Sequence, residues 1–189
     1  MSRALLGIVL VVTAWLVAAP ASAQDAELLA ALRAGGHVGL MRHARAPGND
    51  DPPNFSLGDC ATQRNLSSGG REQARAVGLR LREAGLASVR LVSSQWCRCI
   101  DTAELLDLGP LEQVPFFNSL VSYPRESAQM TRDARDWILA QDWSALTIVV
   151  THQVNIGALV RAYPAEGEIV VVRRAPEGTL EVVGTIGVD

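Results

Sequence analysis

The chain alternates between short apolar runs and longer segments in which apolar residues recur every three or four positions. Short apolar runs are typical of strands, and the three-to-four spacing is typical of helices. The runs predict strands over residues 37–42, 89–93, 111–116, 146–151, 168–173 and 179–186. The spaced segments predict helices over residues 25–34, 70–84, 97–107, 126–141 and 154–162. Because strands and helices alternate, we expect one α/β domain with a mostly parallel central sheet.

Three segments depart from this simple alternation. Residues 146–151 form a continuous apolar run, which predicts a strand buried on both faces. The last two predicted strands are separated only by a Pro-Glu-Gly turn, which indicates a C-terminal β-hairpin. Residues 44–66 are polar and contain three prolines, with no periodicity. A loop of this length inside a compact domain is usually functional.

The first 23 residues have the pattern of a secretory signal peptide. A basic start at Arg3 is followed by an uncharged apolar run over residues 4–19, then by Pro20 and an Ala-Ser-Ala cleavage pattern at 21–23. The alternative is a retained membrane anchor, but the run is shorter than the roughly 20 residues that span a bilayer. We therefore expect a mature single domain over residues 24–189, exported to a periplasm or secreted, with no stable membrane insertion.

Composition narrows the range of partners. The 189 residues include 17 Lys+Arg and 20 Asp+Glu, which gives a net charge of -3. Proteins that bind the nucleic-acid backbone usually carry the opposite sign, so we expect no nucleic-acid partner. All the basic residues are arginines, which excludes Schiff-base and P-loop lysine chemistry.

The expected export affects the oxidation state predicted for the three cysteines. An oxidising compartment favours one disulfide and leaves one thiol over. Cys97 and Cys99 are too close in sequence for an easy mutual bridge, so Cys60 is expected to pair with one of them. Three free or buried thiols remain the alternative. No spacing typical of a zinc site accompanies them.

Polar residues follow three of the predicted strands at their carboxyl ends. Arg42 and His43 end the first strand, Arg98 opens the helix after the second, and His152 ends the buried fourth one. Ligands of parallel α/β sheets bind off the carboxyl ends of the strands. Two imidazoles and two guanidiniums at one edge suit a phosphoryl group. Arginine binds phosphate oxygens through paired donors, and a neutral imidazole can attack phosphorus.

These motifs resemble those of the histidine phosphatase superfamily, the phosphoglycerate-mutase-like group. Residues 40–44 (LMRHA) are similar to its Arg-His-Gly signature, with Ala44 in place of glycine. Residues 93–103 are similar to its second arginine motif, and residues 150–155 to its second histidine motif. The order and spacing fit nearly the whole mature chain.

The resemblance implies a three-layer α/β/α sandwich. We expect no metal or cofactor, because the arginines can supply the positive charge that phosphoryl transfer requires. The resemblance implies that neutral His43 becomes phosphorylated, that Arg42, Arg98 and protonated His152 hold the phosphoryl oxygens, and that water then releases phosphate. It also implies a phosphate contact from Asn49, six residues after His43.

The general acid is the point at which the sequence departs from the family. Ser119 stands where members often carry a glutamate, and a hydroxyl is a poor acid at neutral pH. Glu126 is the substitute candidate, with a solvated glutamate stabilised by the dipole at a helix start as the equal alternative, and Glu112 is a weaker candidate. A good leaving group would need neither. Arg45 and Asn155 are further candidates to line the pocket.

The expected function is therefore metal-independent hydrolysis of a small or cell-envelope phosphate ester. Export argues against a glycolytic mutase, whose substrates are cytosolic. The main alternative is a non-catalytic protein that binds a phosphorylated ligand on the same fold. A metal-dependent hydrolase is disfavoured because no acidic ligand cluster accompanies the histidines.

Overall fold

The computed structural model describes residues 21–86 and 88–188, and the expected signal peptide lies largely outside them. The helices are α1 (Ala21–Ala34), α2 (Ser68–Glu83), α3 (Cys97–Leu106), α4 (Ser127–Leu139) and α5 (Gln153–Val160). The strands are β1 (His37–Arg42), β2 (Arg90–Ser93), β3 (Leu111–Gln113), β4 (Thr147–Thr151), β5 (Ile169–Arg174) and β6 (Leu180–Ile186). Short 3-10 turns occupy Cys60–Thr62, Pro115–Phe117 and Leu120–Ser122.

The six strands form one sheet in the order β3-β2-β4-β1-β5-β6. The pairs β3–β2, β2–β4 and β4–β1 are parallel, whereas β5 and β6 are antiparallel. The expected mostly parallel sheet and the C-terminal hairpin are both confirmed. The parallel pairs bring the carboxyl ends of β1, β4 and β2 to one edge.

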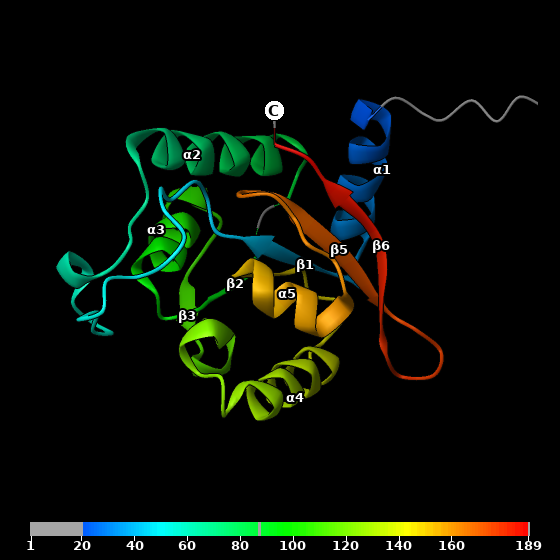
Figure 1. Cartoon of the computed structure of the whole chain (residues 1–189). Helices are drawn as coiled ribbons and strands as arrows, with labels where there is room; N and C mark the ends of the chain where they lie inside the picture. The colour runs from blue at the N-terminus through cyan, green and yellow to red at the C-terminus, as the bar shows by residue number, and fades with distance from the viewer. Residues whose placement is uncertain (1–20, 87, 189) are drawn as a thin grey trace, which may run out of the picture.

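Helices cover both faces of the sheet, so the expected three layers are present. In Figure 1, α1 and α2 lie above the sheet, and α4 and α5 lie below it. The strands alternate between the two cores: Ile148 and Val150 pack with α1, α2 and α3, whereas Val149 between them packs with α4 and α5. All five residues of β4 are buried, as predicted for this continuous apolar run.

Several boundaries differ from those predicted. Helix α1 begins at Ala21, ahead of the expected cleavage point after Ala23. Strand β3 ends at Gln113 instead of residue 116, because Pro115 opens a 3-10 turn and has no N–H to donate to a sheet. Within the described residues, none of the helices has the length and apolar character to cross a membrane.

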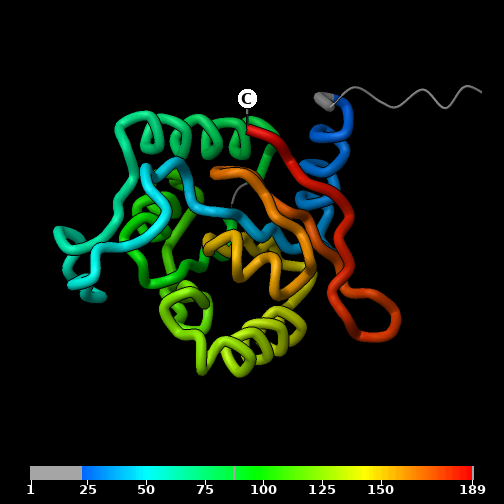
Figure 2. Tube along the Cα trace, viewed as in Figure 1, coloured from blue at the N-terminus to red at the C-terminus, as the bar shows by residue number. Residues whose placement is uncertain are grey.

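The segment between β1 and α2 is the long loop expected from its composition. Figure 2 shows this loop in cyan, running out past α3 and returning to α2. A disulfide joins Cys60 of the loop to Cys97 at the start of α3. Cys99 stays a buried free thiol, and burial raises its pKa to about 12. The disulfide fixes the loop beside the helix that carries Arg98.

Helices α2 and α3 approach each other closely at Gly78. A β-carbon on Gly78 would lie only 2.2 Å from the carbonyl oxygen of Leu106, at the end of α3. This contact is with backbone, which cannot turn aside as a flexible side chain would. The glycine therefore sets the distance between the two helices.

We predict that Gly78→Ala lowers the free energy of unfolding by about 1–3 kcal/mol, the usual cost of overpacking a core. Gly69→Ala, near the start of the same helix, is the matched control. Its β-carbon would meet nothing closer than the Ser67 hydroxyl at 4.0 Å. Alanine there should be neutral or stabilising by up to about 1 kcal/mol. Urea unfolding measures both, and equal effects of the two substitutions would contradict the close-approach argument.

Candidate active site

The two histidines at the ends of β1 and β4 lie next to each other. The His43 backbone N–H donates to the carbonyl of Thr151 at 3.0 Å, which extends the β1–β4 pairing by one residue. The imidazole rings of His43 and His152 are 5.6 Å apart between centroids. Both rings line one pocket of about 190 Å³. The structure therefore brings together the two side chains that the sequence placed 109 positions apart.

His43 is held as a neutral ring with one free nitrogen. Its Nδ1 lies 2.8 Å from the carbonyl oxygen of Ala44, which can only accept, so Nδ1 carries the proton. Burial, together with the charges of Arg98, Arg64 and Arg42, outweighs that hydrogen bond and lowers the pKa of His43 to about 3. The ring is therefore neutral near pH 7, with the lone pair on Nε2. This is the tautomer that a nucleophilic histidine needs.

Ala44, which replaces the family's usual glycine, is accommodated in a small apolar cluster. Its methyl group is buried with Ala46, Leu66 and Ala74. Its backbone N–H donates to the hydroxyl of Thr102 at 3.0 Å. The substitution therefore leaves the turn after His43 packed against α2 and anchored to α3.

His152 has a different set of partners. Arg98 Nη2 donates to its Nδ1 at 3.4 Å, and its Nε2 lies 3.0 Å from the hydroxyl of Ser94. That hydroxyl donates onward to the side-chain oxygen of Asn118 at 3.3 Å, so Nε2–H donates to Ser94. Burial lowers the pKa of His152 well below its usual value, and Arg98 adds to the lowering. This direction favours a neutral His152, whereas the mechanism expected from the sequence uses a protonated His152 against the phosphoryl oxygens. A phosphoryl dianion beside the ring would raise that pKa again.

Arg42 and Arg98 both converge on this edge of the sheet. Arg42 donates to the carbonyl of Pro164 at 3.2 Å and lies 3.6 Å from the Glu166 carboxylate. Arg98 lies in the first turn of α3 and is 3% exposed. Within the described part of the chain, Nε of each guanidinium is buried without a hydrogen-bond partner. A buried N–H donor without a partner is rare, and for Arg42, which lines the pocket, a phosphoryl oxygen would satisfy it.

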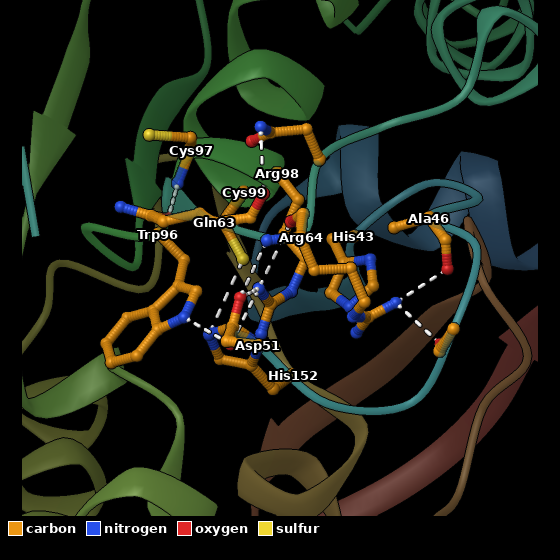
Figure 3. Close-up of polar contacts among 12 residues, drawn as sticks. His43, Ala46, Asp51, Gln63, Arg64, Trp96, Cys97, Arg98, Cys99 and His152 are labelled. Atoms are coloured by element: carbon orange, nitrogen blue, oxygen red, sulfur yellow. Dashed lines mark hydrogen bonds and ion pairs between the residues drawn. The ribbon is translucent and has the colours of Figure 1, made fainter. Parts of the chain in front are cut away.

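Asp51 is a residue that the sequence did not single out. Its carboxylate accepts from Arg98 Nη1 at 2.9 and 3.2 Å, from the Trp96 indole at 2.8 Å and from the backbone N–H of Arg64 at 3.0 Å. Burial alone would raise its pKa, but these hydrogen bonds lower it overall. Asp51 therefore stays ionised and anchors one edge of the Arg98 guanidinium (Figure 3). Asp51 is thus a partner for Arg98, and its low pKa makes it a poor proton donor.

Arg64 is the second residue that the sequence analysis missed. It comes from the long loop, lines the pocket beside His43, and donates to the backbone carbonyls of Ala46 at 2.6 Å and Gly48 at 3.1 Å. Like the other two arginines, it has a buried Nε without a partner among the described residues. The sequence showed an arginine in a loop predicted to be functional, but it did not indicate that the Arg64 side chain points into the pocket.

The pocket lining has a clear chemical character. Arginine, histidine, asparagine, serine and valine side chains dominate it, and no aspartate or glutamate of the described residues is included. The full lining is Arg42, His43, Gly48, Asn49, Arg64, Ser119, Val121, His152, Gln153 and Val154. Asn49 lies where the resemblance placed it, at the wall of the pocket. Ser119 does line the site, so the position of the family's acid is occupied by a hydroxyl.

Four candidates from the sequence lie away from this pocket. Glu126 is exposed at the start of α4, because the chain turns at Leu120–Ser122 and carries it past the histidines to another cavity. Glu112 lies on β3 and pairs with Arg90 at 2.8 Å. Arg45 lines a separate cavity beside α2. The structure therefore does not support Glu126 or Glu112 as the acid, or Arg45 as a lining residue.

Asn155 is the fourth of these candidates. It is buried, and its side chain hydrogen-bonds to backbone groups instead of lining the pocket. Its side chain donates to the carbonyl of Asn118 at 2.8 Å and accepts from the N–H of Leu120 at 3.4 Å. These bonds connect α5 to the segment that carries Ser119 and Val121 into the pocket. Within residues 21–86 and 88–188, no cluster of three histidine, cysteine or acidic side chains is placed to hold a metal.

Comparison with known sequences finds a family match over part of the chain. Residues 38–118 match the model of the histidine phosphatase superfamily (branch 1). That stretch belongs to this superfamily. It contains Arg42, His43 and Arg98, whereas His152 lies beyond it and is brought to the site by the fold. The resemblance to histidine phosphatases is therefore confirmed. None of the curated proteins matches the sequence.

Solved structures extend the similarity over most of the chain. The protein histidine phosphatase SixA complexed with tungstate is 17% identical, with a TM-score of 0.51 over 80% of this chain and 96% of that one. Phosphoserine phosphatase from Entamoeba histolytica is 12% identical, with a TM-score of 0.55 over 80% and 96%. A mycobacterial glucosyl-3-phosphoglycerate phosphatase is 13% identical, with a TM-score of 0.58 over 77% and 96%. At such identities the comparison shows the histidine phosphatase fold.

We predict that the two buried neutral imidazoles make stability depend on pH. In the unfolded chain a histidine binds a proton below about pH 6.5, but folded His43 stays neutral down to about pH 3. The free energy of unfolding should therefore fall as the pH drops below 6.5, by up to about 1.4 kcal/mol per pH unit for each buried histidine. Urea unfolding between pH 7.5 and 5.0 measures this slope.

The variant carrying both His43→Asn and His152→Asn serves as the comparison for this slope. Asparagine is similar in shape to part of the imidazole and does not titrate, so the double variant should show a flatter dependence than the parent. Equal slopes in both proteins would contradict the proposed neutral, buried state of the rings.

Proposed function

We propose that the protein is a phosphatase that hydrolyses phosphate monoesters through a phosphohistidine on His43. The observation that carries the proposal is the state of this ring: neutral, with Nδ1 bonded to Ala44 and the Nε2 lone pair free, in a pocket with Arg42 and Arg64. The pocket guanidiniums of Arg42 and Arg64, each with a buried Nε that has no partner among the described residues, suit a dianionic phosphoryl group, and Arg98 beside His152 adds positive charge. The family match supports phosphatase activity in general.

In the first step, the lone pair of His43 Nε2 forms a bond to phosphorus while the bond from phosphorus to the leaving oxygen breaks. The leaving oxygen takes that bond's electron pair. The arginines stabilise negative charge on the three remaining phosphoryl oxygens, which is the main requirement of phosphoryl transfer. The Ala44 carbonyl holds the proton on Nδ1, where it stabilises the positive charge that the ring acquires.

In the second step, water attacks the phosphorus and the bond to Nε2 breaks. His43 regains its lone pair, and inorganic phosphate leaves. Because no carboxyl group of the described residues lines the pocket, the leaving group must depart with little help from an acid. Esters whose leaving group is stable as an anion, such as aryl phosphates, fit this site best. We therefore propose as substrates small or cell-envelope phosphate esters whose leaving group is stable as an anion.

A non-catalytic phospholigand-binding protein is the second candidate. The observation that favours it is the same lack of a lining carboxyl group, with Ser119 at the usual place of the acid. Such a protein would hold phosphate through the arginines without forming a covalent bond. Phosphate binding without turnover of any ester, and without labelling of His43, is the result that would favour this alternative.

We further propose that the chain is exported and processed after Ala23. The signal-like pattern of the first 23 residues supports this, as does the disulfide between Cys60 and Cys97, because such bonds persist in oxidising compartments. N-terminal sequencing of the protein from a periplasmic fraction should begin at Gln24. A chain that keeps Met1 and is found only in the cytosol would contradict export.

We predict that His43→Asn lowers the hydrolysis of p-nitrophenyl phosphate by about a thousand-fold or more, because the nucleophile is lost. Rapid quenching of the wild-type protein, followed by mass spectrometry of its peptides, should show one phosphoryl group on His43. His37→Asn is the matched control, since His37 lies at the opposite end of β1 and hydrogen-bonds to Gly35. Near-normal activity of His43→Asn would rule out the mechanism.

A further inference from the structure

A second cavity adjoins the pocket that contains the histidines. Asn49, Ser119 and Val121 line both spaces, so the two lie side by side. The second cavity has a volume of about 300 Å³, larger than the first. A phosphoryl group bound between the arginines would leave its ester oxygen and leaving group to extend toward this second space, which we call the outer groove.

Apolar side chains from three parts of the chain line this path. Pro52, Pro53 and Phe55 come from the long loop, Val121 from the turn after β3, and Val154 from the start of α5. Val121 is 62% exposed and Val154 is 38% exposed. Both valines line the polar pocket and present exposed apolar surface that a ligand could contact.

The residues around these side chains hold the path in shape. Phe55 packs on the buried Trp96 ring, with 5.4 Å between centroids. The Trp96 indole in turn donates to Asp51, which fixes the loop to Arg98. Across the groove, Asn155 fixes the backbone on both sides of Ser119. The apolar walls are therefore built on anchored segments.

The charge of the outer groove differs from that of the inner pocket. Its charged lining residues are Asp50 and Asp51, with no arginine among the described residues. Asp51 is neutralised by Arg98, whereas Asp50 is exposed. A second phosphate or a carboxylate on the leaving group would meet a carboxylate there and no cation. A neutral apolar group would bury surface against proline, phenylalanine and valine.

We propose that the outer groove selects phosphate esters whose leaving group is uncharged and apolar, with Val121 as a specificity-determining residue. The proposal rests on the proposed function for the chemistry, and it adds the class of substrate. It disfavours sugar phosphates and esters that carry a second anionic group. It also agrees with the absence of a carboxyl group, among the described residues, from the lining of the inner pocket, since aryl groups leave readily as anions.

The test separates binding from turnover. In the His43→Asn protein, which should not turn over substrate, calorimetry compares the dissociation constants of hexyl phosphate and glucose 6-phosphate, both esters of primary alcohols. We expect hexyl phosphate to bind about ten-fold tighter or better, because burial of a few methylene groups is worth at least that factor. Equal or tighter binding of glucose 6-phosphate would overturn the proposal.

A second pair of ligands tests charge and the role of Val121. Phenyl phosphate should bind the same protein tighter than 4-carboxyphenyl phosphate. Adding Val121→Arg should shift this ratio toward the carboxylate by about five-fold, the effect of a partly exposed ion pair. Val182→Arg is the matched control, because Val182 is 38% exposed on β6, outside the lining of both cavities. An unchanged ratio in Val121→Arg would overturn the assignment of Val121.

Failure of this inference can be told from failure of the proposed function. Turnover and His43 labelling in the wild-type protein, without the ligand preference, would support the phosphatase proposal and contradict the proposed selectivity of the outer groove. The ligand preference without turnover of any ester would support the outer groove and contradict the phosphatase proposal. It would then define the ligand class of a binding protein. Circular dichroism of each variant shows whether it is folded.

Discussion

The parallel pairing of β1 with β4 is the interaction on which the candidate site depends. It places Arg42 beside Thr151 in register, and the next hydrogen bond joins the His43 N–H to the Thr151 carbonyl. His152 follows directly, so both imidazoles leave the sheet at the same level. A shift of register by one residue would send alternate side chains to the opposite core. The same buried apolar strand that stabilises the sheet therefore sets the distance between the two rings.

Burial and positive charge act on these rings in the same direction. Desolvation disfavours the imidazolium form, and the guanidiniums of Arg42, Arg64 and Arg98 disfavour it further. The result is a pair of neutral histidines among fixed cations, a combination that attracts a dianion and leaves a lone pair ready to attack it. The Ala44 carbonyl determines which nitrogen of His43 holds that lone pair.

The long loop contributes as much to the site as the strand ends do. Asp51 binds Arg98, Arg64 enters the pocket, and Cys60 is bonded to Cys97. A loop of this length loses considerable conformational entropy on ordering. The disulfide offsets part of that entropy cost. The Asp51 carboxylate, which accepts four hydrogen bonds, orients the guanidinium of Arg98. The loop also supplies Pro52, Pro53 and Phe55 to the lining of the outer groove, so one segment contributes to both the proposed phosphoryl site and the proposed leaving-group site.

The sequence by itself determined the strand–helix alternation, the mostly parallel sheet, the C-terminal hairpin and the strand ends at which Arg42, His43, Arg98 and His152 stand. These follow from local periodicity and from the rule that ligands bind at carboxyl ends of parallel strands, both of which are properties of short segments. Only the tertiary structure decided the disulfide partner of Cys60, the entry of Arg64 and Asp51 into the site, and the placement of Glu126 outside it. It also decided that His152 is neutral. The physical reason is that the direction of a loop and the burial of a ring depend on contacts between residues far apart in the chain, which no local pattern records.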